Sequence, residues 1–254
     1  MVITPAQYEK IKDSLPVQRG NVRLSNLTVL NALLYVAENG CKWRGLPKHF
    51  GNWHSIYVRM NRWAKNGVLD RVFEKLQLEQ IVRIKIEAFS LDSTIVKVHP
   101  DGTGALKKNG PQAIGKSRGG WTTKIHMVAA NARTAIIFAL SPGNAHDAPC
   151  GRQLLLDLGP MPEGLPLLMD KAYEGDETRQ QVLDLQMEPV VPPKSNRVDP
   201  WEYNQELYKK RNEIERLFRR LKGFRRIFSR FEKLDVVFLA FLYFALIVEA
   251  LRVV

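Results

Sequence analysis

The spacing of apolar residues along this 254-residue chain changes near residue 85. Before that point, apolar residues recur every three or four positions, which is the period of an amphipathic helix. The spacing predicts three helices, at residues 5–15, 26–38 and 53–65. Ser25 is the expected N-cap of the second helix. After residue 85 come short runs rich in β-branched residues, which are typical of strands. We therefore place a domain boundary between residues 1–84 and 85–254.

The second part of the chain has the pattern of a mixed α/β fold. Strands are expected at residues 88–98, 122–130, 134–140, 165–170 and 188–191, and helices at residues 148–158, 176–185 and 201–222. Three successive strands with helical crossovers to a fourth and a fifth are compatible with a ribonuclease H-like mixed sheet flanked by helices. This order alone also fits other α/β folds. The first part would form a small all-α, helix-turn-helix-like domain before it.

The composition is that of an ordinary globular protein, with 45% hydrophobic and 25% charged residues. Lys and Arg (38) outnumber Asp and Glu (26), and the formal charge of +12 indicates a polyanionic partner. Cys41 and Cys150 lie far apart, without CxxC or CxxH spacing, which excludes a disulfide framework and argues against structural zinc. No basic segment followed by an apolar one opens the chain, so we expect a cytoplasmic protein.

The longest apolar run, VVFLAFLYFALIV, covers 13 residues from Val236 to Val248. A membrane-spanning helix needs about 20 apolar residues. Asp235 and Glu249 also flank the run directly. We therefore expect a buried core or interface helix, and no membrane partner.

Two aspartates lie in or directly after predicted strands. Asp92 interrupts the apolar strand AFSLDSTIVKV, and Asp170 closes the run LPLLMD. A carboxylate among apolar neighbours is costly unless it is paired or binds a metal ion. Two-metal phosphoryl transfer needs such hard oxygen ligands at rigid positions. For each aspartate taken singly, a solvated acid at a strand end is an alternative explanation.

A third acid, Glu215, lies on the predicted helix at residues 201–222. At about 100° per residue, one face of this helix carries Tyr208, Arg211, Glu215 and Lys222. The apolar stripe of the helix lies about 100° away from that face. An ordinary amphipathic helix, with Glu215 paired to Arg211 or Arg219, would explain the charges but not the tyrosine.

These four polar residues carry a family resemblance. The spacing Tyr208-x2-Arg211-x3-Glu215-x6-Lys222 resembles the Tyr-Arg-Glu-Lys signature of bacterial insertion-sequence DDE transposases. The segment RNEIERLFRRLKGFRR resembles the group called insertion sequence family five. LDSTIVKVHP, GGWTTKIHMVAAN, PGNAHD and LLMDKAYEGD extend the resemblance over most of residues 88–233, and the segment from CKWRGLPKHF onward is similar to the helical region that precedes the catalytic domain in that group.

The resemblance implies that Asp92, Asp170 and Glu215 are catalytic acids that bind two Mg²⁺ ions, for which Mn²⁺ would substitute. It implies that the other three signature residues hold DNA beside these acids. No covalent link between protein and DNA is expected. The lone histidines are more often packed or solvent-bonded than catalytic, so we assign them no metal.

Basic residues gather in two further segments. Residues 207–233 contain 11 Lys or Arg and 3 Glu, an excess that phosphate binding would explain better than a solvated helix face. We count Arg219 among the expected DNA contacts. Residues 104–124 contain five cations, five glycines and no acid, and would form a flexible loop that either grips DNA or is disordered. Lys124, at the end of this segment, is a further expected DNA contact.

The predicted helix at residues 53–65 could enter the major groove of DNA. Arg59 and Arg62 would then be available for base edges. The alternative is that the apolar residues of this helix are simply the core stripe of a small bundle. The DNA-contacting role and the core-packing role are compatible if they use different faces of the helix.

Together these features predict a DNA transposase that binds transposon-end inverted repeats through residues 1–80 and cleaves and transfers strands with two metal ions. Its partners would be double-stranded DNA, both transposon ends and target, and a second copy of the chain in a homodimer or higher oligomer. We expect it in the bacterial cytoplasm, associated with the nucleoid. Two alternatives are a catalytically silent, transposase-derived DNA-binding regulator and a ribonuclease H-like DNA nuclease.

Overall fold

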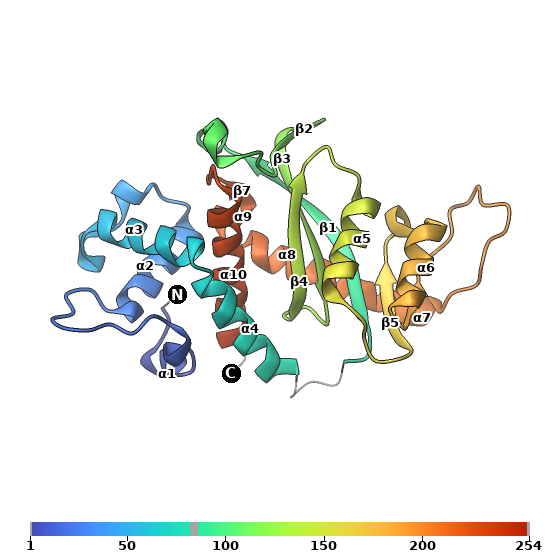
Figure 1. Ribbon diagram of the computed structural model, residues 1–254, viewed down its shortest axis with the longest axis horizontal. Coiled ribbons are helices and arrows are strands. Elements are labelled where there is room, and N and C mark those ends of the chain that lie inside the picture. Colours follow the sequence, from blue (N-terminus) through green and yellow to red (C-terminus); the bar gives the residue numbers. More distant parts are fainter. Residues whose placement is uncertain (1, 82–85, 253–254) are drawn as a thin grey trace. The chain divides into compact units, whose positions relative to one another are not determined.

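The computed structural model describes residues 2–81 and 86–252. The chain divides into two compact units, and each unit is built from separate stretches of sequence (Figure 1). The helical unit comprises Met1–Val82, Lys97–Gln112 and Arg220–Val254, and the sheet unit comprises Arg83–Val96 and Ala113–Arg219.

The helical unit is organised around the apolar helix α10. Its helices are α1 (Pro5–Glu9), α2 (Asn26–Asn39), α3 (Trp53–Lys65), α4 (Val68–Ile81), α9 (Arg225–Phe228) and α10 (Asp235–Leu251). Helix α10 packs against α3, α4 and α9. It buries apolar residues around its whole circumference, including Phe238, Phe241 and Phe244, as a helix in a protein core does. The expectation of a buried helix is confirmed, and no helix in the described part of the chain is long and apolar enough to cross a membrane.

The ends of the helices in this unit follow from local hydrogen bonding. Ser25 caps α2, because its side chain accepts a hydrogen bond from the Thr28 amide. The helix expected at residues 5–15 is shorter: α1 ends at Glu9, and a 3₁₀ turn follows at Lys12–Ser14. Helix α4 was not predicted, although its apolar residues recur at helical spacing directly after the turn at Gly67.

The sheet unit contains most of a mixed sheet. Its strands are β1 (Phe89–Val98, which runs on into the helical unit), β2 (Gly115–Ser117), β3 (Gly120–Ala129), β4 (Ala135–Pro142), β5 (Leu165–Met169) and β6 (Met187–Val190). The strand order is β2-β3-β1-β5-β6, with β4 on β3. Pairs β3–β4 and β2–β3 are antiparallel, whereas β1, β5 and β6 run parallel. This confirms the expected ribonuclease H-like mixed sheet. The short strand β7 (Ser229–Arg230) pairs with residues 97 and 98 of β1 inside the helical unit.

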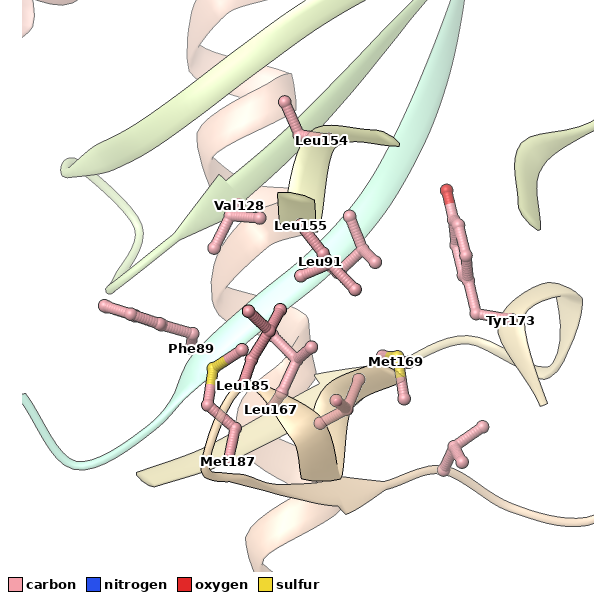
Figure 2. Packing of buried hydrophobic residues seen from close by; sticks show 12 residues of the cluster. Phe89, Leu91, Val128, Leu154, Leu155, Leu167, Met169, Tyr173, Leu185 and Met187 are labelled. Carbon is pink, nitrogen blue, oxygen red and sulfur yellow. The ribbon is translucent and has the colours of Figure 1, made fainter. Parts of the chain in front are cut away.

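Helices cover the sheet and complete its core. Helix α5 (Asp147–Leu158) packs on β3 and β4 and contacts α6 (Asp176–Asp184). Figure 2 shows the buried cluster between the sheet and these helices. In it, Leu91 of β1 and Leu167 and Met169 of β5 pack with Leu155 of α5. These residues are almost fully buried and close-packed, so β1 and β5 have rigid positions here.

Two further expected elements differ from the structure. The helix predicted from residue 201 begins only at α7 (Gln205–Tyr208) and continues through a 3₁₀ turn at Lys209–Arg211 into α8 (Asn212–Lys222). Trp201 lies before it because its indole donates to the Val191 carbonyl at 2.8 Å and the Arg179 guanidinium lies 3.6 Å from its ring centroid. The loop expected at residues 104–124 contains β2 and the first half of β3.

The packing units differ from the division expected at residues 84 and 85. Residues 220–254 pack with the first 82 residues, because the apolar surface of α10 is buried by α3 and α4. The expected domains, with DNA binding in residues 1–84 and catalysis in residues 85–254, stay a prediction about function.

Candidate active site

Asp92 and Asp170 lie side by side in the sheet unit. Strands β1 and β5 are parallel neighbours, and their register pairs Leu91 with Met169. Asp92 follows Leu91 within β1, and Asp170 directly follows Met169, the last residue of β5. Neighbouring residues in register point to the same face of a sheet, and adjacent strands lie about 4.8 Å apart. The sheet therefore brings together two acids that are 78 positions apart in the sequence.

The two aspartates are held in the same way by the backbone. Asp92 Oδ1 accepts a hydrogen bond from the Ser93 amide at 2.7 Å, and Asp170 Oδ1 accepts one from the Lys171 amide, also at 2.7 Å. Asp170 is the N-cap of the 3₁₀ turn that follows β5. In each aspartate, one carboxylate oxygen is therefore oriented by the backbone amide of the next residue. This contact restrains the side chain without the help of another side chain.

Arg211 connects Asp92 to the third acid. Its Nη1 donates to Asp92 Oδ2 at 2.7 Å, and its Nη2 donates to Glu215 Oε1 at 2.6 Å. The side chains of Asp92 and Arg211 are 15% and 19% exposed, whereas that of Glu215 is 45% exposed. Tyr208 lies beside this pair, with its ring centroid 5.8 Å from the Arg211 guanidinium carbon. The structure therefore brings together five of the expected site residues.

Two family models cover most of the chain. One, described as "Transposase DDE domain", matches residues 83–248, and one described as "Putative transposase of IS4/5 family" matches residues 3–73. The chain belongs to the transposase DDE domain family. This confirms the expected insertion-sequence DDE transposase, and with it a divalent-metal-dependent enzyme. The four-residue signature stays a resemblance.

This transposase is also similar to two shorter proteins. It is 31% identical over 127 residues to "Putative transposase for insertion sequence element IS6501" of Brucella ovis, a match that covers 49% of this chain and 94% of that protein. It is 35% identical over 108 residues to "Uncharacterized protein y4sN" of Sinorhizobium fredii, which covers 41% of this chain and 82% of that one.

Two solved structures are distantly similar to the transposase. The piggyBac transposase, in a synaptic complex with hairpin DNA, aligns with a TM-score of 0.41 and 9% identity over 76% of this chain. The alignment covers 47% of that protein, so the present chain spans about half its length. The Mos1 mariner paired-end complex with Mn aligns with a TM-score of 0.33 and 12% identity, over 91% of this chain and 74% of that one.

The electrostatics of the transposase site follow from its burial and its three acids. The pKa of Asp92 is raised to about 6, first of all by burial and also by the charges of Asp170 and Glu215, although the Ser93 amide and Arg211 act to lower it. The three carboxylates are therefore close enough to repel one another. A divalent cation would relieve this repulsion, and carboxylate oxygens are the ligands that Mg²⁺ and Mn²⁺ prefer. The donor set thus fits such ions.

The side chains are not arranged around an ion as they stand. Among the described residues, no three His, Cys, Asp or Glu side chains are grouped so that they could hold one metal ion. The Arg211 guanidinium lies between Asp92 and Glu215 and contacts an oxygen of each. Metal binding at these acids therefore requires a rearrangement of side chains.

Lys124 is placed differently from the other expected DNA contacts. Its Nζ donates to Asp147 Oδ1 at 2.9 Å and to the Ala145 carbonyl at 2.7 Å, and its side chain is 11% exposed. Asp147 Oδ1 also accepts a hydrogen bond from the Ser93 hydroxyl at 2.9 Å. A DNA contact by Lys124 stays a prediction, and it would require these bonds to break.

The remaining expected DNA contacts lie on α8 and α3. Arg219 is exposed on α8, and Lys222, the last residue of α8, is half-buried, which lowers the pKa of its amine. On α3, Arg62 is exposed, whereas Arg59 donates from Nη1 to the Leu24 carbonyl at 2.9 Å. Arg62 is therefore better placed than Arg59 to reach a ligand.

Ser93 and Asp147 contribute to the surroundings of the site but were not predicted from the sequence. Ser93 follows the catalytic candidate directly, and Asp147 is the first residue of α5, where an acid is favoured by the helix dipole. These local signals are common. Only the tertiary structure shows that Ser93 of β1 and Asp147 of α5, 54 positions apart, share a hydrogen bond.

Proposed function

We propose that this transposase cuts DNA at the ends of an insertion sequence and joins the freed 3′ ends to target DNA, with Asp92, Asp170 and Glu215 as the acids that hold its metal ions. One observation supports the assignment above the others. The register of β1 and β5 sets Asp92 beside Asp170, and Arg211 holds Glu215 next to Asp92. Three carboxylates from separate elements with one arginine between two of them leave an excess of negative charge that a divalent cation would neutralise.

Two Mg²⁺ ions, or Mn²⁺ in their place, would activate the attacking oxygen and stabilise the leaving oxygen of the phosphodiester. The contribution of the protein is to hold the three acids in position for this chemistry. Asp92 and Asp170 extend from buried strands, and each has one oxygen fixed by a backbone amide. Glu215 comes from a helix and is more exposed, so it can adjust to the ions and the substrate.

Cationic side chains would bind the DNA backbone near these acids. Arg211 contacts Asp92, Tyr208 lies beside Arg211, and Arg219 is exposed on the same helix as Glu215. We assign phosphate contacts to these residues and to Lys222. The same proposal assigns recognition of the terminal inverted repeats to residues 1–84, with the exposed Arg62 on α3 as a contact.

The two ends of a transposon must be held together during transfer, so we propose a homodimer or higher oligomer as the working form. Its partners are the inverted repeats and the target duplex. We place the protein in the bacterial cytoplasm, at the nucleoid, because its substrate is there.

The proposal is tested by cleavage of labelled duplexes that carry either the inverted repeat of the element or a scrambled sequence, with Mg²⁺, Mn²⁺ or EDTA. We expect metal-dependent nicking at the boundary of the repeat. Asp170→Asn should abolish nicking and keep repeat binding, because the amide preserves shape and removes charge. Asp184→Asn, at an exposed position of α6, is the matched control.

Each other outcome contradicts a part of the proposal. Full cleavage by the Asp170→Asn variant would exclude Asp170 as a metal ligand. Specific binding without cleavage under any metal would indicate a DNA-binding regulator. Equal cleavage of both duplexes would indicate a general nuclease.

A further inference from the structure

Arg211 lies between two of the acids that the proposed function assigns to metal ions. Nη1 contacts Asp92 Oδ2 at 2.7 Å and Nη2 contacts Glu215 Oε1 at 2.6 Å, so one rigid planar group contacts both carboxylates. Asp92 and Arg211 are less than one-fifth exposed, and solvent therefore screens their contact less than it screens a surface ion pair. The guanidinium acts as the cation of the site in this state.

A divalent ion at this site would bind the same carboxylates that Arg211 contacts. Asp92 Oδ1 already accepts the Ser93 amide, and Oδ2 accepts Arg211. Mg²⁺ binds oxygen ligands at about 2.1 Å, so an ion on Oδ2 would lie within a few ångströms of the guanidinium. The two positive charges would repel each other in a partly desolvated site. Arg211 and the metal ion would therefore compete for Asp92.

We propose that Arg211 is an internal counter-cation that competes with divalent metal for Asp92 and Glu215, and that it leaves both carboxylates when metal binds. The inference rests on the proposed function, because it takes these acids as the metal ligands. Without metal, Arg211 stabilises the mostly buried Asp92 and fixes the start of α8 beside β1. Once displaced, its planar group is free for a DNA phosphate.

The test is Mn²⁺ binding to the full chain without DNA, measured by calorimetry and by the electron paramagnetic resonance of free Mn²⁺. Arg211→Gln removes the competing charge, and we expect it to bind Mn²⁺ about tenfold more tightly than the wild type. Arg216→Gln is the matched control, because Arg216 lies on α8 and pairs with Glu213 at 2.8 Å, outside the three acids. Its Mn²⁺ affinity should equal that of the wild type. Equal or weaker binding by Arg211→Gln overturns the inference.

Asp170→Asn separates failure of this inference from failure of the proposed function. If Asp170→Asn removes Mn²⁺ binding and Arg211→Gln does not strengthen it, the metal site stands and the competition is overturned. If Asp170→Asn leaves Mn²⁺ binding unchanged, the acids are not the metal site, and both proposals fail.

A measurement on the wild type covers the case in which Arg211→Gln does not fold. The Arg211 side-chain N–H signal, assigned by its loss in Arg211→Lys, is followed by nuclear magnetic resonance during a Mg²⁺ titration. The Lys171 amide, which donates to Asp170, reports occupancy of the site. We expect both signals to shift with one midpoint. An unchanged Arg211 signal while the Lys171 signal saturates overturns the inference.

Discussion

The two faces of β1 carry two different charge networks. Asp92 and Ser93 are adjacent, so their side chains point to opposite faces of the sheet. On one face, Arg211 contacts Asp92 and Glu215, and Asp170 lies close enough to raise the pKa of Asp92. On the other face, the Ser93 hydroxyl and Lys124 both donate to Asp147.

The difference lies in the balance of charge. On the Ser93 face, an aspartate and a lysine that are 25% and 11% exposed contact each other directly. On the Asp92 face, three carboxylates share a site with one arginine, which contacts two of them. The first network can be stable with protein groups alone, whereas the second has an excess of negative charge that a bound cation would neutralise. We infer that the first supports the strand and the second carries the chemistry.

The largest expected effect is on the Asp92 face. Asp92→Asn should lower DNA cleavage by on the order of 10²–10³-fold, because it removes a charged ligand from the site of transition-state stabilisation. Cleavage rates under saturating Mg²⁺ measure this effect, with Asp184→Asn as the control. A loss smaller than about threefold would place the chemistry elsewhere.

The next largest effect is on the Ser93 face. Lys124→Met should lower the free energy of unfolding by about 3 kcal/mol, because it leaves the partly buried Asp147 without its ammonium partner. Chemical denaturation measures the change, and Lys116→Met, at an exposed position of β2, is the matched control. Unchanged stability together with weaker DNA binding would make Lys124 a DNA contact after all.

The pH dependence of stability separates the two faces further. The folded-state pKa of Asp92 is about 6, above its ordinary value of 3.8, so folding favours the protonated acid. Stability should therefore fall as pH rises from about 4 to about 6, by on the order of 2 kcal/mol, and stay low above that range. In EDTA, Asp92→Asn should remove this decrease, which denaturation of both proteins between pH 4 and pH 8 measures. Parallel pH profiles for the two proteins would contradict the expectation.

The smallest effect should come from the hydroxyl that joins β1 to α5. Ser93→Ala removes the hydrogen bond to Asp147 and should cost about 1 kcal/mol of stability. The Ser93 amide still holds Asp92 Oδ1, so Mn²⁺ affinity should stay within about twofold of the wild type, a change smaller than one lost hydrogen bond would cause. Thermal denaturation and Mn²⁺ titration together measure this. A large loss of metal affinity would show that the two faces are coupled.

Much of the fold could be predicted because periodicity is a local property. Residues 26–38 and 53–65 are helical as expected, and the five expected strands are all present. The predictions failed where tertiary contacts decide the outcome. Residues 201–204 are not helical because Trp201 is held by Val191 and Arg179, and residues 115–117 form a strand because they pair with β3.

The sequence by itself determined which acids are candidates for the site and which face of the helix carries Glu215. Residue type and a 100° helical repeat need no tertiary information. It could not set Asp92 beside Asp170, since that depends on the pairing of Leu91 with Met169 across parallel strands. Nor could it distinguish Lys124, buried against Asp147, from the exposed Arg219. Charge can be read from residue type. The burial of a side chain and its ion-pair partners depend on which distant segments pack together, so only the tertiary structure decided them.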